Sequence, residues 1–486
     1  MVLEYSCMYD VIIIGAGITG TLIARELSKY NLSVAVLEKC NDVGNATTNA
    51  NSAIIHSGYD PVPGTLKAKF NVLGNKMYPD LCKDLDVHFE QIGSLTVALY
   101  DEQLPMLKEL AERSKQNGVE VKLLTKEEVL KMEPNLSLEV KGALLAPTAG
   151  IVNPFTLVVH AMENAVDQGV ELHLNEEVKN ITGNKDGFEV LTSKGKYQTK
   201  VVINCAGIYG DKIHSLVEPV DYNIKARKGQ YFVLDHYAKG LVNHVIFPLP
   251  SEKGKGILVS PTTSGNYIVG PSSEWSDDKD AVACDKPTLD NVKSQALAMV
   301  PNIPFNQVIR IFAGNRPTPS THDFVIGTSK KYPNFINASG IESPGLVSSP
   351  AIAEEVVNNY VSKVLTLVKK DNWSGKVRPR VHLNELNEEE RNALIKKDHK
   401  YGRIICNCEK VTYGEILDEL SRSVPPHSVK ALKKRTRAGF GKCQGGFCQP
   451  LVIQILAEHY GVKFSDVNYD KLGSEICKYS TKGEEK

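Results

Sequence analysis

The sequence lacks an excess of charge of either sign, and it lacks a long apolar run. Its 486 residues include 57 lysines and arginines and 57 aspartates and glutamates, so the formal net charge is zero. That balance gives no indication of binding to nucleic acid or to an anionic membrane surface. No segment reaches the roughly 18 consecutive apolar residues that a membrane-spanning helix needs. Any membrane association would therefore go through a partner protein.

We expect no signal peptide, and we find no internal repeat in the sequence. The apolar run that starts at Val11 follows Asp10 and lacks the basic segment that opens a signal peptide. Ten cysteines without a disulfide-like framework favour a reducing cytoplasm. The length is too great for one hydrophobic core and indicates about two to four domains.

Four cysteines near the C-terminus carry the strongest chemical signal. One residue separates Cys406 from Cys408, four separate Cys443 from Cys448, and glycines surround the second pair. Four thiolates that backbone N–H groups approach closely suit a [2Fe–2S] cluster. The alternatives are a structural zinc site, although zinc mostly uses C-x2-4-C pairs, and four unrelated buried thiols. Because a cluster accepts one electron at a time, it would indicate electron transfer to another protein rather than to oxygen or a nicotinamide.

A dinucleotide-binding motif opens the chain. A buried strand over 10–15 leads into a glycine-rich turn, a helix to about residue 30 and a second strand that ends at Glu38. In this context Gly15 makes the tight turn, Gly17 admits a pyrophosphate and Gly20 lets helix and strand pack. The helix N-terminus faces the phosphates, and Glu38 would accept hydrogen bonds from ribose hydroxyls.

The motif alone does not separate NAD from FAD, but three features favour FAD. The motif stands at the start of the chain, as it usually does in flavoproteins. Residues 47–52 follow the Glu38 strand and would supply hydroxyls and amides along the pyrophosphate. A later strand over 201–207 ends in small residues beside the dinucleotide.

These motifs carry a resemblance to known families. Residues 8–360 resemble the D-amino-acid-oxidase-like flavoprotein superfamily, especially its glycerol-3-phosphate dehydrogenase and L-2-hydroxyglutarate oxidase branches. The run Thr436-Arg-Ala-Gly-Phe-Gly-Lys-Cys443-Gln-Gly-Gly-Phe-Cys448 resembles the bacterioferritin-associated ferredoxin-type [2Fe–2S] domain, in which all four cysteines are ligands. Together the two parts resemble anaerobic-type glycerol-3-phosphate dehydrogenases. The resemblance implies FAD and a [2Fe–2S] cluster as cofactors.

The resemblance also implies an architecture. We expect an α/β fold in which a Rossmann-like FAD-binding domain carries an inserted, mostly antiparallel substrate domain and a small helical C-terminal [2Fe–2S] domain. The expected boundaries are 1–85, 150–215 and 325–365 for the discontinuous FAD-binding domain, 86–149 and 216–324 for the substrate domain, 366–400 for a linker and 401–486 for the [2Fe–2S] domain.

Local patterns predict several helices. Residues 104–118 and 126–132 are predicted as surface helices, and apolar spacing predicts one helix over 352–369. Thr412 and Glu415 have the spacing of a capping box. The turn at 340–349 precedes a helix, and in the superfamily this turn lies under the flavin pyrimidine ring. The predicted cofactor contacts are Gly15, Gly17, Thr19, Gly20, Glu38, Thr47, Thr48, Ser52, Ala206, Gly207, Gly340, Ile341, Gly345 and Leu346.

Oxidation of an alcohol needs a base near neutral pKa, and an anionic substrate needs cations. His56 resembles the histidine of flavin-facing loops and is our candidate base, with flavin packing as the alternative role. Arg316 matches a G-x-R-P pattern whose arginine binds the substrate anion in several family members, and Lys67 is a weaker candidate. His322 is expected to be structural.

The substrate is the open question at this stage. We expect a phosphorylated or carboxylated alcohol: glycerol 3-phosphate first, then a 2-hydroxy acid such as L-2-hydroxyglutarate, then an amine or another alcohol. An electron-transfer subunit without its own substrate is a hypothesis of a different class. The expected electron acceptor is a second flavoprotein or an iron–sulfur subunit, and the expected location is the cytoplasm.

Overall fold

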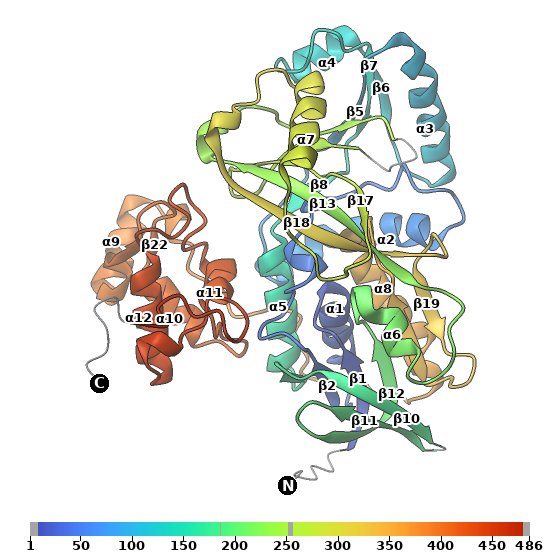
Figure 1. Ribbon diagram of the computed structural model, residues 1–486, viewed down its shortest axis with the longest axis vertical. Helices are drawn as coiled ribbons and strands as arrows, with labels where there is room; N and C mark the ends of the chain where they lie inside the picture. Colours follow the sequence, from blue (N-terminus) through green and yellow to red (C-terminus); the bar gives the residue numbers. More distant parts are fainter. Residues whose placement is uncertain (1–7, 185, 251–255, 480–486) are drawn as a thin grey trace.

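The computed structural model describes residues 8–184, 186–250 and 256–479, in two large sheets and a separate C-terminal domain (Figure 1). No helix among these residues is long and apolar enough to cross a membrane. The fold is α/β, as expected.

The first sheet has eight strands built around a parallel centre. Its order is β10-β11-β12-β1-β2-β9, and β20 pairs with the C-terminal half of β12 and with β19. The strands are β1 (Met8–Ile14), β2 (Val34–Leu37), β9 (Glu171–His173), β10 (Val178–Asn184), β11 (Gly187–Thr192), β12 (Lys196–Asn204), β19 (Val325–Thr328) and β20 (Phe335–Ser339).

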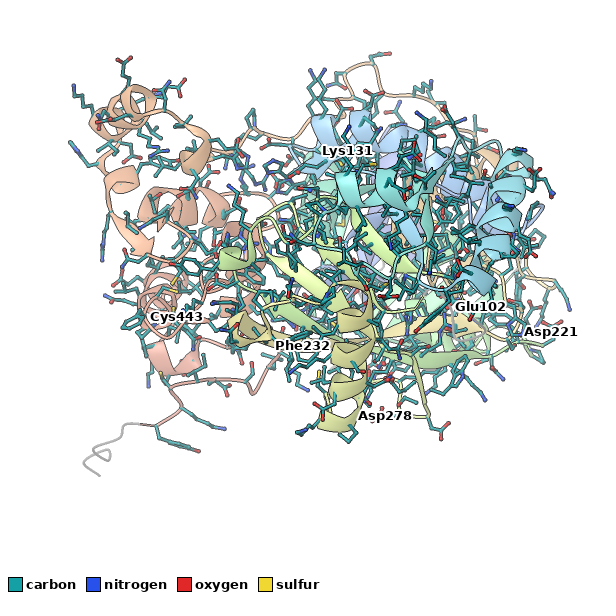
Figure 2. All side chains as sticks on the ribbon, turned by 90° about the horizontal axis from the view of Figure 1, so that it is seen from above. Glu102, Lys131, Asp221, Phe232, Asp278 and Cys443 are labelled. Atoms are coloured by element: carbon teal, nitrogen blue, oxygen red, sulfur yellow. The ribbon has the colours of Figure 1, made fainter. Side chains whose placement is uncertain are left out.

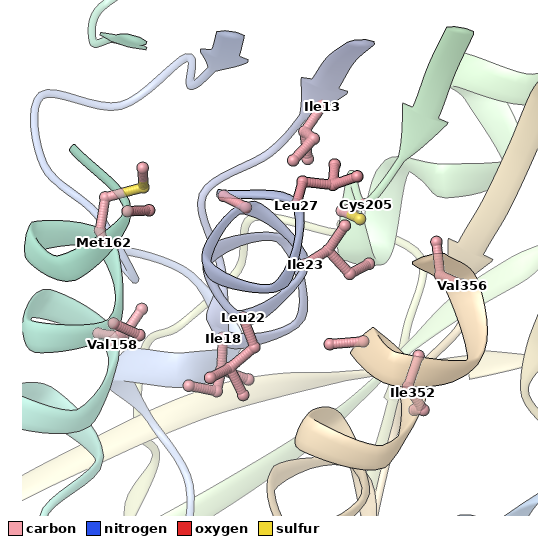
Figure 3. Packing of buried hydrophobic residues seen from close by; sticks show 14 of the residues in the cluster. Ile13, Ile18, Leu22, Ile23, Leu27, Val158, Met162, Cys205, Ile352 and Val356 are labelled. Atoms are coloured by element: carbon pink, nitrogen blue, oxygen red, sulfur yellow. The ribbon is translucent and has the colours of Figure 1, made fainter. Parts of the chain in front are cut away.

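Four helices cover this sheet and share one apolar core. They are α1 (Ile18–Leu27), α2 (Leu66–Asp84), α5 (Pro154–Asp167) and α8 (Gly345–Asn359). In Figure 3, α1 lies between α5 and α8, with Ile23 and Leu22 pointing toward its neighbours. Because α1 is buried along its whole length, its N-terminus is fixed at the carboxyl end of β1.

The second sheet has nine strands and is mostly antiparallel. Its order is β17-β13-β16-β15-β14-β5-β7-β6, with β18 on the other side of β13. The strands are β5 (Ser94–Ala98), β6 (Lys122–Thr125), β7 (Gly142–Ala146), β13 (Ile224–Leu234), β14 (Val245–Pro248), β15 (Leu258–Pro261), β16 (Tyr267–Gly270), β17 (Glu274–Ser276) and β18 (Val308–Pro319). Helices α3 (Leu104–Gln116), α4 (Lys126–Met132) and α7 (Lys286–Met299) accompany it. A small sheet of β3 (Ile54–Ile55), β8 (Gly150–Val152) and β4 (Phe89–Glu90) completes this part.

The C-terminal domain has its own small core. It contains α9 (Glu388–Lys397), β21 (Ile404–Cys406), β22 (Val411–Thr412), α10 (Tyr413–Leu420), α11 (Val429–Thr436) and α12 (Gln449–Tyr460). The predicted capping box is confirmed at the start of α10, where Glu415 N–H donates to Thr412 Oγ1 and Thr412 N–H donates to Glu415 Oε2. Seen from above in Figure 2, this domain with Cys443 lies to one side of the larger body that carries Phe232.

The helices predicted at 104–118 and 126–132 are confirmed as α3 and α4, but the helix predicted over 352–369 is wrong at both ends. Helix α8 starts at Gly345, where the buried residues of its first turns include Ser348 and Ser349. Small buried serines carry no apolar periodicity, so the pattern misses that start. The α-helix ends at Asn359 and a 3-10 turn covers Val361–Lys363, yet Val361, Leu365 and Leu367 stay packed on the same core and continue the apolar spacing beyond the α-helix.

Candidate active site and metal centre

A cavity of about 1710 Å³ is lined by residues of both large sheets. It exceeds the roughly 300–1,000 Å³ of a pocket for one small ligand. The volume therefore suits a long cofactor together with a substrate. Of the predicted cofactor contacts, all but two line this cavity; Gly20 and Gly340 are not among its described lining residues.

The glycine-rich turn shows why each glycine is required. A Cβ on Gly15, which has a φ of +103°, would lie 2.5 Å from the Cys205 carbonyl oxygen. A Cβ on Gly20 would lie 2.0 Å from the Gly15 oxygen, so Gly20 serves packing between helix and strand. A Cβ on Gly17 would meet only Thr48 Oγ1, at 3.6 Å, and would otherwise project into open space. The space in front of Gly17 is thus kept clear for a ligand.

Two helix N-termini face this cavity without a cap from their own N-cap residue, although the Ile18 N–H of α1 donates to Thr48 Oγ1 at 3.1 Å. Gly17 precedes α1 and Pro344 precedes α8, and neither provides a capping hydrogen bond. Both helix starts line the cavity. Uncapped N–H groups and the positive end of the helix dipole favour negative charge. The α1 end suits a pyrophosphate, and the α8 end suits the flavin edge that becomes negative on reduction.

Glu38 is buried at the end of β2 and holds the turn together. Its Oε2 accepts from the Ala16 N–H at 2.7 Å, and its Oε1 accepts from the Cys40 N–H at 2.9 Å. It also lines the cavity. Its remaining lone pairs are available to ribose hydroxyls, which is the role that the sequence predicts for it.

Arg316 lies on β18 in the cavity wall and is held by backbone carbonyls. Its Nη2 donates to the carbonyl oxygens of Ser272 at 2.8 Å and Lys228 at 3.2 Å, and its Nε donates to that of Arg227 at 3.2 Å. No carboxylate among the described residues lies within ion-pair distance of it. Burial lowers the pKa of Arg316 somewhat, which leaves it cationic at any neutral pH.

Lys67 and Arg227 share one carboxylate in the same wall. Lys67 Nζ and Arg227 Nη2 each lie 2.8 Å from a different oxygen of Glu342. Burial raises the pKa of Glu342, but the two cations outweigh burial and hold it below its ordinary value. Lys67 therefore forms an ion pair with Glu342 and also lines the cavity. Glu274 also lines the cavity, and its carboxylate accepts from the Ser272 hydroxyl at 2.7 Å. With Arg316 included, three cations face two carboxylates.

His56 lines the cavity and packs on Phe247, with 5.7 Å between the ring centroids. Asn71 and Asn75 on α2 donate to its backbone oxygen at 2.7 and 3.2 Å, which fixes the loop that carries it. His322 also lines the cavity and has a positive φ of 61°. Tyr231, which the sequence did not single out, lies there too, with its hydroxyl 3.3 Å from Ser52 Oγ. Burial raises the pKa of Tyr231, so it keeps its proton.

The four C-terminal cysteines form two close pairs, each joining one cysteine of the first motif to one of the second. Cys408 and Cys443 lie with their sulfurs 3.7 Å apart, and the Cys406 thiol contacts that of Cys448. The contact with Cys448 lowers the pKa of Cys406 to about 6, with help from the backbone N–H groups of Gly439 and Glu409. Several more N–H groups of the 445–447 turn point at Cys443. Such N–H groups stabilise thiolates and the sulfurs of a cluster.

The pairing distinguishes the two candidate metal centres. A tetrahedral zinc site needs three or four ligands around one point, whereas the four cysteines contact one another two by two. A [2Fe–2S] cluster instead needs two thiolates for each of two iron atoms. Two pairs, 406 with 448 and 408 with 443, provide that arrangement. The residues present therefore fit the cluster better than they fit zinc.

Comparison with known proteins decides the family. The FAD dependent oxidoreductase family model matches residues 10–359, and the model of the BFD-like [2Fe-2S] binding domain matches residues 404–458. The chain belongs to the FAD-dependent oxidoreductases. The first match gives FAD as a cofactor of this oxidoreductase, and the second indicates a [2Fe–2S] cluster.

Named relatives of this oxidoreductase match it over different lengths. It is 47% identical to a glycerol 3-phosphate dehydrogenase of Caloramator mitchellensis over 98% of this chain and all of the relative. It is 34% identical to a glycerol 3-phosphate oxidase of Mycoplasma pneumoniae, a match that covers 76% of this chain and 97% of the oxidase. The solved structure of dithionite-reduced L-alpha-glycerophosphate oxidase from M. pneumoniae with FAD bound superposes with a TM-score of 0.74 at 33% identity, covering 77% of this chain and 100% of that chain.

The oxidoreductase also has site residues that sequence reasoning missed. Glu342 was overlooked because the pattern of its loop drew attention to glycines rather than to the acid. Lys430, Asp470 and Lys471 of the C-terminal domain line the FAD cavity as well. No local motif marks them, since only the docking of one domain on another brings them to the cavity.

Proposed function

We propose that this protein oxidises glycerol 3-phosphate to dihydroxyacetone phosphate and passes the electrons through its C-terminal domain to a separate protein. The observation that carries this proposal is the match over both domains to a protein named glycerol 3-phosphate dehydrogenase, at 47% identity. The protein named glycerol 3-phosphate oxidase in M. pneumoniae matches 76% of this chain.

The charge of the cavity wall supports a phosphorylated substrate. Three cations, Arg316, Lys67 and Arg227, face the two carboxylates described above, so the wall keeps a net positive charge. Arg316 has only neutral carbonyl partners among the described residues, and it is the group best placed to pair with an anion. A phosphate monoester carries about −1.5 to −2 charges at neutral pH. Arg316 would bind it directly, while Lys67 would add longer-range attraction.

Proton transfer would fall to His56 and Tyr231, which line the same cavity. An imidazole is a common general base, so His56 would take the C2 hydroxyl proton. Tyr231 stays protonated because burial raises its pKa, so it would donate rather than accept a hydrogen bond. FAD, when bound, supplies a two-electron acceptor for the C2 hydride, and the cluster supplies a one-electron carrier.

The outer face of the metal centre supports a protein acceptor. Cys408 is exposed, whereas Cys406 and Cys448 are buried. Phe447, whose N–H points at Cys443, is 83% exposed, and Tyr237 beneath Lys442 is 78% exposed. Exposed aromatic side chains are enriched at protein interfaces. Another flavoprotein or an iron–sulfur subunit would dock there.

Anaerobic mixing with substrate tests the proposal. Glycerol 3-phosphate should bleach the flavin absorbance near ~450 nm, and the EPR signal of the reduced cluster should follow. Arg316→Lys should raise KM by about tenfold or more, because a charge-assisted hydrogen bond contributes roughly 1.5–3 kcal/mol. Arg391→Lys, on α9 and outside the cavity, is the matched control.

Two outcomes would contradict the proposal. Rapid bleaching by L-2-hydroxyglutarate without bleaching by glycerol 3-phosphate would make Arg316 a carboxylate-binding residue. Bleaching by no alcohol, with reduction only by another protein, would make the chain an electron-transfer subunit.

A further inference from the structure

The C-terminal domain reaches into the FAD cavity. Lys430 on α11 and the neighbours Asp470 and Lys471 line that cavity, together with Cys40 and Asn45 of the first domain. Cys40 and Asn45 follow Glu38 in the chain. In this type of fold, the acid at the position of Glu38 binds the ribose of the adenosine half of the dinucleotide. The three C-terminal residues therefore border the adenosine diphosphate end of the site rather than the flavin end.

Direct hydrogen bonds fix these residues against the first domain. Asp470 accepts from Asn41 Nδ2 through its backbone oxygen and from Asn45 Nδ2 through Oδ1, the latter at 3.4 Å. The other carboxylate oxygen, Oδ2, accepts from Lys430 Nζ at 2.6 Å. Lys430 is thereby held at the cavity wall, while Lys471 is exposed at its rim.

A buried ion cluster anchors the contact. Asp42 lies 2.7 Å from Lys434 Nζ and 2.9 Å from Arg435 Nη2, and all three side chains are almost completely buried. Lys434 Nζ also donates to the carbonyl oxygen of Val43 and to Asn45 Oδ1. The segment 41–45 is thus bonded to the C-terminal domain on one side. On the other side, Gly44 N–H donates to Ala16 O in the glycine-rich turn.

We propose that the C-terminal domain forms the outer wall of the adenosine diphosphate end of the FAD site, with Lys430 and Lys471 as cationic contacts for that dianionic half of the cofactor. The domain then has a second task besides carrying the cluster: it retains FAD. The relation is reciprocal, because a ligand that binds the docked form better also stabilises docking.

FAD affinity of the full-length protein tests the proposal without any turnover assay. Flavin-stripped protein is titrated with FAD, and bound flavin is followed by fluorescence. Lys430→Ala/Lys471→Ala should raise Kd about tenfold, in line with the loss of a charge-assisted contact. Lys471→Glu, at an exposed side chain, should also raise Kd and keeps the test available if the double variant folds poorly.

Lys478→Ala is the matched control, because this lysine lies in the same C-terminal segment and does not line the cavity. Iron and labile sulfide per chain, measured on every variant, report whether the domain is intact. A Kd within twofold of the unmodified protein in both Lys471→Glu and the double variant, with the cluster intact, would overturn the proposal. So would an equal increase in Lys478→Ala. Neither result depends on which alcohol reduces the flavin.

Discussion

Replacing Asp42 with alanine should cost more than any other single change at the interface between the domains. Asp42 is the counter-ion of two side chains, Lys434 and Arg435, which are 2% and 0% exposed. Arg435 also donates to the carbonyl oxygens of Val424 and Ala431, but Asp42 is the only carboxylate paired with it among the described residues. Without Asp42, two buried positive charges would face each other unpaired.

The burial of Asp42, Lys434 and Arg435 sets the size of the loss in unfolding free energy that we expect for Asp42→Ala. Removing one partner of a buried ion pair costs about 3–5 kcal/mol because an uncompensated charge stays behind. The pKa of Asp42 agrees with this: burial raises it, but Arg435 and Lys434 outweigh burial and hold it below its ordinary value. A carboxylate with a lowered folded pKa stabilises the protein above its ordinary pKa, and this contribution is lost as the pH falls through the lowered value. The Asp42→Ala penalty should therefore be full at pH 7 and shrink in strong acid.

The assay is urea-induced unfolding at pH 7, followed in parallel by far-ultraviolet circular dichroism and by cluster absorbance. Asp221→Ala is the matched control, because its pair with Lys330 is exposed on both sides and such pairs contribute about 0–1 kcal/mol. If Asp42→Ala costs under about 1 kcal/mol, or no more than the control, then the buried ion pair does not hold the domains together.

Two further changes separate cofactor binding from folding. Gly17→Val should abolish FAD binding but leave the unfolding midpoint of the flavin-free protein unchanged, because Gly17 has an extended backbone and its Cβ would meet only Thr48 Oγ1. The control Gly195→Val, in open space away from the cavity, should retain FAD. Retention of FAD by Gly17→Val would refute the pyrophosphate assignment. Cys408→Ser should lose iron and labile sulfide without unfolding because Cys408 is exposed, whereas the exposed Cys477, outside the four, should tolerate serine with its iron content intact. Full iron in Cys408→Ser would remove Cys408 from the ligand set.

The parts of the site that depend on local backbone chemistry could be predicted from the sequence. Gly15 needs a positive φ, Gly17 needs open space and Glu38 needs the end of a strand, and each requirement leaves a mark within a few residues. The cysteine pairs are equally local, because 406 with 408 and 443 with 448 each belong to one turn. The sequence did not indicate that the contacts cross between them, 406 to 448 and 408 to 443.

The parts that depend on tertiary contacts could not be predicted. Lys67 is predicted as a cation for the substrate, and only the fold shows that Glu342, far along the chain, takes one of its hydrogen bonds. Helix α8 starts earlier than its apolar pattern because close packing there uses serine instead of leucine or valine. The wall formed by Asp470 and its neighbours arises when two domains dock, and docking leaves no periodicity in either segment.

The C-terminal domain contacts both the first domain and the second sheet, and these contacts bear on how it would carry electrons. It contacts the first domain through the Asp42 cluster and through the stacked rings of Phe155 and Phe440, with 5.6 Å between their centroids. It contacts the second sheet where Arg437 Nη2 donates to Asn266 Oδ1 at 3.0 Å and Arg310 Nη1 donates to Gln444 Oε1 at 3.1 Å. Gln444 and Phe440 lie close to Cys443 in the chain. The hydrogen bond from Arg310 to Gln444 and the stacking of Phe155 on Phe440 therefore hold the metal centre itself in place.

Electron transfer slows steeply as the distance between two centres grows, and a domain on a loose tether would spend much of its time too far away. Because the C-terminal domain contacts both the first domain and the second sheet, the fold itself sets the position of the cluster relative to the FAD cavity. Under the proposal above, Lys430 and Asp470, which the Asp42 cluster anchors, would also close the adenosine end of the FAD site. A single interface would therefore couple retention of the flavin to delivery of its electrons, and loosening that interface would impair both at once.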